Sequence, residues 1–233
     1  TEHAIRQQRN ERLAAIGQIA GGVAHEVRNP LNVIKTSVYY LLNARNASPE
    51  KRAEHLARIE KQVGIADGVV TALSNFAKMP IPDRSPFRLG PLVTDVLDSV
   101  RLPDPIAVET DLPEALPPVL ADAGQIRIVV SNLVRNARDA MPQGGRLTVT
   151  GRADGGAVRL AVADTGHGIP AEDLRRIMEP FFTTKARGIG LGLAISNAIL
   201  AKNEGSLSVE SVPGQGSVFT ITLEAAPGAA ATL

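Results

Sequence analysis

The sequence predicts two parts of different fold class: an antiparallel helical hairpin at residues 1–79 and an α/β sandwich at residues 87–224. Apolar residues recur every three or four positions in the first part, which is the period of an amphipathic helix. After a proline-rich segment at residues 80–86, short alternating runs typical of strands are interspersed with helical runs. That mixture favours one helical layer packed on one mixed sheet.

Two apolar stripes define the hairpin. The turn between them lies at residues 43–49, where Ser48 is a good N-cap and Pro49 a good first helical residue. Neither helix has a further apolar element nearby in sequence, so we expect a homodimer whose four-helix bundle buries both stripes. The first stripe comprises Leu13, Ile16, Ala20, Val23, Val27, Leu31, Ile34, Val38 and Leu41, and the second Leu56, Ile59, Val63, Ala66, Val70, Leu73 and Ala77.

The α/β part follows a segment that we predict to be a semi-rigid linker, because residues 80–86 hold three prolines with Met79 before them. The tail at residues 225–233 is rich in small residues, and we expect it to be mobile. Helices are expected at residues 91–101, 121–141, 171–178 and 191–202, and strands at residues 106–110, 118–120, 146–152, 157–163, 207–211 and 217–223.

Composition excludes several classes of function. The net charge of +1 and the aromatic content of 3% argue against a nucleic-acid binder, which needs a basic excess or stacking platforms. The absence of cysteine excludes disulfides, thiolate metal sites and cysteine nucleophiles. The polar N-terminus is unlike a signal peptide, and no apolar run is long enough to span a bilayer. We therefore expect no membrane contact by these residues and a cytoplasmic location.

The first candidate site lies in the middle of the first helix. His25 falls off the apolar stripe, so it is expected to face solvent, where a neutral imidazole is a competent nucleophile. Glu26 is placed to accept a proton, and Asn29 shares the face of His25. Pro30 removes a helical hydrogen bond and predicts a kink. The alternative is a surface histidine on a helix that contains a proline. A zinc site of the His-Glu-x-x-His type is excluded because the last position is Asn29.

The second candidate site is predicted in the α/β part. Asn132 and Asn136 share one helix face, and carboxamide oxygens can ligate Mg²⁺; two polar surface residues are the alternative. Asp164 continues the buried parity of its strand, so its carboxylate needs a donor, such as an adenine amine. Gly166 and Gly168 then let the backbone approach a flat ligand. The alternative is an Asp-Gly turn closed by its own backbone.

A glycine run at residues 188–192 leads directly into the last helix. Glycines at the start of a helix allow backbone N–H groups to cradle phosphate. The run is not a Walker loop, because no Gly-Lys-Ser/Thr follows it, and it does not follow a strand as a dinucleotide fold requires.

Taken together in this order, the motifs resemble the catalytic core of a two-component sensor histidine kinase. Residues 25–31 are similar to the phosphoacceptor box, 132–136 to the N box, 164–168 to the first glycine box, 180–185 to the F box and 188–192 to the second glycine box. The resemblance extends over residues 12–223. It implies a Bergerat-type ATP-binding domain after the dimerisation hairpin.

The resemblance also implies roles. His25 would take the γ-phosphoryl group of ATP and pass it to an aspartate of a response-regulator receiver domain, with Glu26 as the base. Asn136 would ligate Mg²⁺, Asn132 would lie near the phosphates, and Asp164 would recognise adenine. Asn29 matches the residue type that helps to dephosphorylate the regulator. The remaining nucleotide-binding positions would be Gly166, Gly168, Thr184, Lys185, Gly188, Gly190, Leu191 and Gly192.

Some positions depart from the family pattern. Thr165, Asp139 and Ile189 stand where many members carry Asn, Lys and Thr, and the lid between Phe182 and Gly188 is short. Two rival functions therefore stay open. One is a catalytically weak dimeric scaffold that binds a regulator. The other is an ATP-driven machine of the related gyrase and chaperone superfamily, which the helical His box disfavours.

Overall fold

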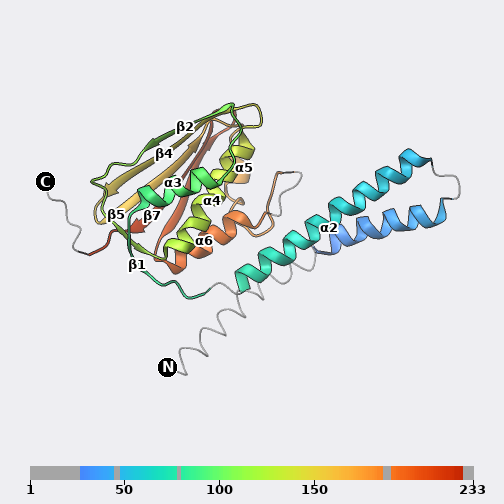
Figure 1. Ribbon diagram of the computed structural model, residues 1–233, viewed down its shortest axis with the longest axis horizontal. Helices are drawn as coiled ribbons and strands as arrows, with labels where there is room; N and C mark the ends of the chain where they lie inside the picture. Colours follow the sequence, from blue (N-terminus) through green and yellow to red (C-terminus); the bar gives the residue numbers. More distant parts are fainter. Residues whose placement is uncertain (1–26, 45–47, 78–79, 186–189, 228–233) are drawn as a thin grey trace, which may run out of the picture. The chain divides into compact units, whose positions relative to one another are not determined.

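A computed structural model of the protein describes residues 27–44, 48–77, 80–185 and 190–227. The chain divides into two compact units. The first, the helical unit, comprises Thr1–Met79 and Pro180–Leu191, and the second, the α/β unit, comprises Pro80–Glu179 and Gly192–Leu233. This succession of a helical region and a sheet with helices matches the predicted fold class. Figure 1 shows the described elements of each.

The helical unit contains the predicted hairpin. Residues 27–43 are helical, and α2 spans Pro49–Ala77. Ser48 caps α2, because its Oγ accepts a hydrogen bond from the backbone N–H of Lys51 (3.3 Å) and its carbonyl accepts one from Arg52 (3.0 Å). The first helix continues past Pro30, which is buried. Near the turn, the rings of Tyr40 and His55 stack with centroids 4.1 Å apart and hold the two helices together.

The described part of the hairpin leaves much of the predicted α2 stripe exposed. Ser37 and Val69 are among its buried residues. Leu56, Val63 and Val70, which recur every seven residues, are 58%, 51% and 55% exposed. A heptad repeat that its own chain does not cover is typical of a surface that packs against another helix.

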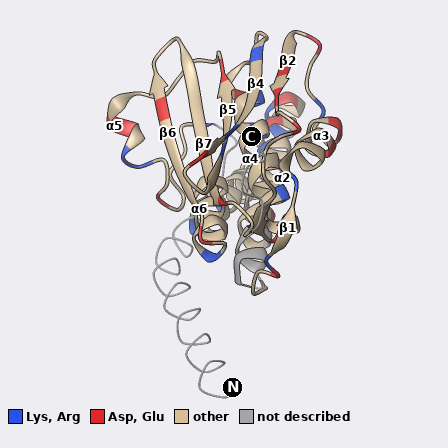
Figure 2. Ribbon diagram, turned by 90° about the vertical axis from the view of Figure 1, so that its left-hand side faces the viewer, with Lys and Arg blue, Asp and Glu red and all other residues tan. Residues whose placement is uncertain are grey.

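The α/β unit is built on a five-stranded sheet of order β2-β4-β5-β7-β6. Strand β2 is parallel to β4, and the other neighbours are antiparallel. Figure 2 shows these strands side by side. The strands are β2 (Ile106–Asp111), β4 (Gly145–Asp154), β5 (Ala157–Asp164), β6 (Ser206–Val212) and β7 (Gly216–Glu224); β1 (Ser85–Phe87) pairs separately with β3 (Val119–Ala121).

One face of the sheet is covered by α3 (Leu89–Ser99), α4 (Ala123–Ala140) and α6 (Gly192–Lys202) (Figure 1). Alternate residues of β5 point into this layer, and Val158, Leu160 and Val162 are at most 1% exposed. The apolar face of α4 packs onto them through Ile126, Val129, Val130 and Leu133. Fully burying each such side chain contributes about 1.5–3 kcal/mol, so this layer is the core that positions α4 and α6.

Three segments differ from the expectations. The helix expected at residues 171–178 is only α5 (Ala171–Leu174), which is followed by turns such as Glu179 N–H to Arg176 O (2.8 Å). Residues 80–86 contain the start of β1, so they do not all lie outside the sheet structure. The tail begins with Ala225 and Ala226 hydrogen-bonded to the carbonyls of Gly156 and Pro118. None of the described helices has the length and hydropathy that crossing a bilayer requires.

Candidate active site

The phosphoacceptor box is only partly within the described residues. His25, Glu26 and the stripe residues before them lie outside these ranges, so their predicted roles stay predictions. Asn29 is exposed on the helix at residues 27–43, while Pro30 next to it is buried. Asn29 is therefore accessible on this helix, and the orientation expected for His25 stays a prediction.

In the α/β unit, α4 carries the two asparagines. Asp122 caps this helix, with its Oδ1 accepting from the backbone N–H of Gln125 at 3.0 Å. The apolar face of α4 fixes its rotation, and this leaves Asn132 and Asn136 half-buried on a second face. Both are more enclosed than the polar surface residues that the alternative interpretation requires.

Asn132 holds the start of α6. Its Nδ2 donates to the Oγ of Ser196 at 3.0 Å, and Ser196 is only 1% exposed. A Cβ on Gly192 would lie 2.5 Å from the Oδ1 of Asn132. The first residue of α6 thus packs against the Asn132 side chain, which would have to shift to admit a Cβ at position 192. The backbone N–H groups of a helix's first turn lack helical partners and favour anions.

Asp164 ends β5 with a buried carboxylate that is 7% exposed. Its Oδ1 accepts from the backbone N–H of Gly166 at 2.8 Å, which is the Asp-Gly turn of the alternative interpretation. A carboxylate can accept about four hydrogen bonds. The turn therefore orients Asp164 and is compatible with a ligand donor at the same side chain.

The glycines of the loop after Asp164 make close approaches to the protein itself. A Cβ on Gly166 would lie 2.5 Å from the carbonyl oxygen of Ala140, at the end of α4. Gly168 has a φ of +69°, and its Cβ would lie 2.2 Å from the carbonyl oxygen of Val212. These contacts explain the two glycines without a ligand. The approach to a flat ligand stays a prediction.

The loop is further fixed by side chains that replace missing backbone partners. Thr165 Oγ1 accepts from the N–H of Arg146 at 2.9 Å, and Ser211 Oγ accepts from that of Ile169 at 2.8 Å. His167 N–H donates to the carbonyl of Ala140 at 3.2 Å. The loop after β5 is thus tied to α4, β4 and β6, and it holds Asp164 in a rigid frame.

The described residues of the predicted lid and its flanks are 180–185 and 190–191, which belong to the helical unit. Phe181 N–H donates to the carbonyl of Gly190 at 2.9 Å, and both residues have positive φ, +68° and +71°. Thr184 is exposed, and Lys185 N–H donates to Thr183 Oγ1 at 3.1 Å. Gly188 lies outside the described residues. Leu191, which is 5% exposed, leads directly into α6.

Within the α/β unit, α4 brings three motifs together. Asn132, Asn136 and Ala140 are four residues apart and so share one helix face. Asn132 contacts the start of α6, and the carbonyl of Ala140 contacts the glycine loop that follows Asp164. Asn136 therefore lies between a helix N-terminus, which favours negative charge, and the loop of a buried carboxylate. This arrangement suits a ligand with anionic groups at one end and hydrogen-bond donors at the other.

Sequence reasoning missed Ser196 and Ala140. Both act through a partner far away in the sequence, so no local spacing marks them. The one available signal was Ser196 itself, a hydroxyl within the apolar run of the last helix that needs a partner once buried.

Comparison with known proteins gives two family matches. Residues 15–80 match the His Kinase A (phospho-acceptor) domain. Residues 121–227 match the histidine kinase-, DNA gyrase B-, and HSP90-like ATPase family. Similar curated proteins include sensor histidine kinase ZraS of Escherichia coli strain K12, 35% identical over 93% of this chain and 47% of its own. Sporulation kinase E of Bacillus subtilis strain 168 is 31% identical over 94% of this chain and 30% of its own. The chain thus spans about half or less of these relatives.

Solved structures agree in fold. The catalytic domain of histidine kinase ThkA is 32% identical, with a TM-score of 0.54 over 63% of this chain and 99% of that domain. The structure of histidine kinase ThkA in complex with response regulator protein TrrA has a TM-score of 0.73 at 27% identity, over 97% of this chain and 66% of that one. The helical part and the α/β part of this chain thus both have counterparts in solved structures of a histidine kinase.

Proposed function

Because the chain belongs to the family of two-component sensor histidine kinases, we propose that it phosphorylates His25 from ATP and passes the phosphoryl group to an aspartate of a response-regulator receiver domain. The observation that carries this proposal is the position of Asn136 on α4, between the start of α6 beside Asn132 and the loop that presents Asp164. The phosphates of a nucleotide would lie at the start of α6, and its adenine amine would donate to Asp164.

The transfer needs a nucleophile, an acceptor of its proton and an aligned phosphate. The unprotonated ring nitrogen of His25 would attack the γ-phosphorus while the bond from that phosphorus to the bridging oxygen of ADP breaks. Glu26, adjacent in sequence, would hold and then accept the proton on the other ring nitrogen. In the second step a carboxylate oxygen of the regulator attacks the same phosphorus, the P–N bond breaks and His25 is regenerated.

The α/β unit would hold the nucleotide through Asp164 at adenine and the N-terminal N–H groups of α6 at the phosphates. Gly190, Leu191 and Gly192 bring the chain into that terminus, and Thr184 and Lys185 are candidates for phosphate contact from the lid. Within the described ranges, no three His, Cys, Asp or Glu side chains gather closely enough to hold a metal ion. The half-buried carboxamide of Asn136 fits Mg²⁺, which binds few protein ligands and completes its shell with phosphate oxygens and water. When bound, Mg²⁺ would neutralise charge on the phosphates.

Two partners are proposed with the activity. A second copy would cover the exposed heptad residues Leu56, Val63 and Val70 and make a four-helix bundle. A receiver domain would dock on the same helices. ThkA, which this chain resembles, has been crystallised with the regulator TrrA. Asn29, exposed on its helix, would then assist dephosphorylation of the regulator. We expect Asn29→Ala to slow that dephosphorylation and leave phosphorylation of His25 in place.

The test is incubation with γ-³²P-labelled ATP and Mg²⁺. We expect a label on the protein that is lost in acid and kept in alkali, as a phosphoramidate is. His25→Ala should abolish this label and leave ATP affinity unchanged. Label that survives His25→Ala would overturn the acceptor assignment. ATP hydrolysis without any labelled protein would favour the ATP-driven machine, and no nucleotide binding would favour the scaffold.

A further inference from the structure

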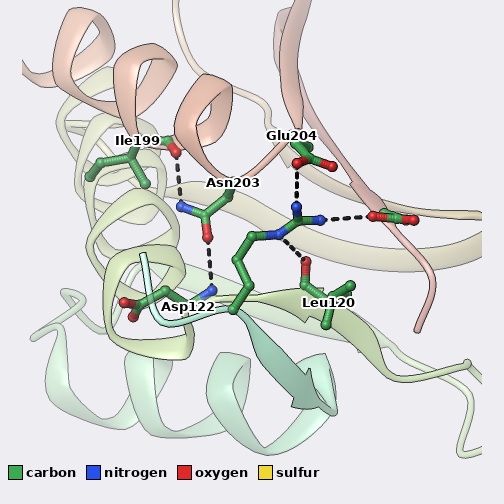
Figure 3. Close-up of polar contacts among 7 residues, drawn as sticks. Leu120, Asp122, Ile199, Asn203 and Glu204 are labelled. Atoms are coloured by element: carbon green, nitrogen blue, oxygen red, sulfur yellow. Dashed lines mark hydrogen bonds and ion pairs between the residues drawn. The ribbon is translucent and has the colours of Figure 1, made fainter. Parts of the chain in front are cut away.

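Arg84 joins the start of the α/β unit to three distant segments. Its Nε donates to the carbonyl of Leu120 at 3.3 Å, its Nη1 pairs with Glu204 at 2.5 Å and its Nη2 with Glu224 at 2.7 Å (Figure 3). The Arg84 side chain is 21% exposed, whereas those of Glu204 and Glu224 are 67% and 46% exposed, so the guanidinium is half-buried and its two partners lie at the surface. The hydrogen bond that Arg84 donates to Glu204 raises the pKa of Arg84 above its ordinary value, so the guanidinium stays charged at every physiological pH.

Beside Arg84, a buried asparagine completes the connection. Asn203, fully buried, accepts from the N–H of Asp122 at 2.8 Å and donates to Ile199 O at 2.9 Å (Figure 3). It also donates to Gln125 Oε1 at 2.9 Å. The Nε2 of Gln125 in turn donates to the carbonyl of Pro80 at 3.0 Å. Every polar group of this side-chain pair has a partner, which is what makes a buried polar network stabilising.

Glu204 has an unusual backbone conformation. It lies just beyond α6 with a φ of +58°, where glycine or asparagine is favoured. The following Gly205 N–H donates to Leu200 O at 2.8 Å and closes the end of the helix. A residue with a side chain is strained here, and in this protein that side chain binds Arg84. Such strain, when surrounding contacts maintain it, points to a role for the residue.

The chain is therefore fixed to the α/β unit earlier than the first strand. Pro80 O is held by Gln125, Asp83 N–H donates to Asp122 Oδ2 at 3.0 Å, and Arg84 follows. We call these contacts of Pro80, Asp83 and Arg84 the entry latch. Residues 78 and 79 alone separate the end of α2 at Ala77 from the latch.

We propose that the entry latch shortens the tether between α2 and the ATP-binding unit, so that Arg84 is a positioning residue for phosphoryl transfer to His25. The inference rests on the proposed function. A short tether raises the effective concentration of one unit near the other, which falls roughly as the −3/2 power of tether length. The latch also ends on α4 and on the C-terminal end of α6, whose first residue contacts Asn132. A displacement of α2 would thus act on these helices instead of being absorbed by slack chain.

The test compares Arg84→Met with Arg127→Met in the full chain of 233 residues. Arg127 makes an exposed ion pair with Asp95 in the same unit and serves as the matched control. For Arg84→Met we expect kcat of phosphohistidine formation to fall on the order of fivefold, the tether effect, with KM for ATP unchanged. Hydrogen exchange at the Asp83 amide should become faster. Arg127→Met should leave kcat, KM for ATP and hydrogen exchange at the Asp83 amide unchanged.

A second pair of variants separates tether length from stability. Insertion of three glycines between Met79 and Pro80 should lower kcat as Arg84→Met does, and the two changes together should add little. Glu204→Gly removes one partner of Arg84 while relieving the positive φ, so it should lower kcat without lowering the melting temperature.

Either of two results would overturn the proposal. One is a rise in KM for ATP at constant kcat, because Arg84 would then act on the nucleotide site. The other is a glycine insertion without effect, because the tether would then not limit transfer. If the unaltered chain forms no phosphohistidine, the proposed function fails instead, and exchange at the Asp83 amide still decides whether the latch exists.

Discussion

The two units differ in how much of its apolar surface each unit buries by itself. In the α/β unit, the apolar faces of β5 and α4 pack against each other and are buried, with Leu160 and Ile126 at 0% exposure. The hairpin leaves Val63 and Leu56 more than half exposed, although they belong to its heptad repeat. A nucleotide-binding unit with its own core can move as a body, whereas the hairpin needs a partner to complete its core.

The units also differ in how they build chemistry. On the hairpin, His25, Glu26 and Asn29 lie within five consecutive positions of the sequence, so a linear motif defines the candidate site. In the α/β unit, Asn136 and Asp164 belong to distant segments, which α6 and the glycine loop bring together. A variant in the α/β unit should therefore lower phosphohistidine formation and leave the dimer intact. A variant on the exposed face of the hairpin should weaken the dimer and leave ATP affinity unchanged.

The largest effect is expected for Asn136→Ala. Loss of the carboxamide proposed to meet Mg²⁺ should lower phosphohistidine formation by about 1,000-fold, because phosphoryl transfer relies on charge neutralisation. The dimer, formed by the other unit, should persist in sedimentation equilibrium. Arg135→Ala, at the exposed neighbouring position on α4, is the control and should keep its activity. A fully active Asn136→Ala would remove this residue from the site.

Val63→Glu should weaken the dimer and leave ATP binding unchanged, the reverse of what Asn136→Ala should do. A carboxylate placed in an apolar helix interface loses hydration without gaining a partner, so the dimer dissociation constant should rise about 100-fold. ATP affinity, measured by calorimetric titration, should not change. Ala57→Glu adds the same charge at an exposed position outside the heptad stripe and should leave the dimer intact. An unaltered dimer in Val63→Glu would place the dimer interface elsewhere.

Substituting Gly168, with Gly155 as the comparison, tests how tightly the loop that follows Asp164 is packed. Gly168→Ala should destabilise the α/β unit by about 2 kcal/mol or more, because the new Cβ combines positive φ with a clash at Val212 O. Gly155→Ala, at a φ of +55° with open space around it, should cost only about 1 kcal/mol. Urea unfolding of both variants measures the difference. Equal costs would show that the close approach to Val212 relaxes freely.

The smallest effect concerns the exposed start of α2. A hydrogen bond from Lys51, 2.9 Å away, lowers the pKa of Glu54, and one from Ser48 lowers that of Glu50, both from an ordinary value of 4.5. A lowered folded-state pKa adds stability above pH 4.5 that is lost as pH falls through the lowered value. We expect the amide protection factors in this turn, which are corrected for the intrinsic pH dependence of exchange, to fall below pH 4.5, and Glu54 to titrate below 4.5 in an NMR titration. A carboxylate that titrates at or above that value would contradict it.

Sequence patterns predicted the elements that depend on local rules. The turn at Ser48 and Pro49 and the presence of a helix near residues 121–141, observed as α4 at Ala123–Ala140, follow from residues close together in the chain. Strand β1 was not predicted, because three prolines indicate a linker and its partner β3 is far along the sequence. The prediction for residues 171–178 was too long, because α5 ends at Leu174 and is followed by turns.

For the site, the sequence by itself determined which chemical groups are present: imidazole, carboxamides, a buried carboxylate and helix-opening glycines, in an order that identifies the family. Only the tertiary structure decided what each group contacts. Asn132 is bound to Ser196, Gly166 to the end of α4, and Arg84 to three segments at once. The reason is physical: a hydrogen bond or a close backbone approach between distant residues depends on how the helices and the sheet pack, and packing is a property of the whole fold rather than of any window of the chain.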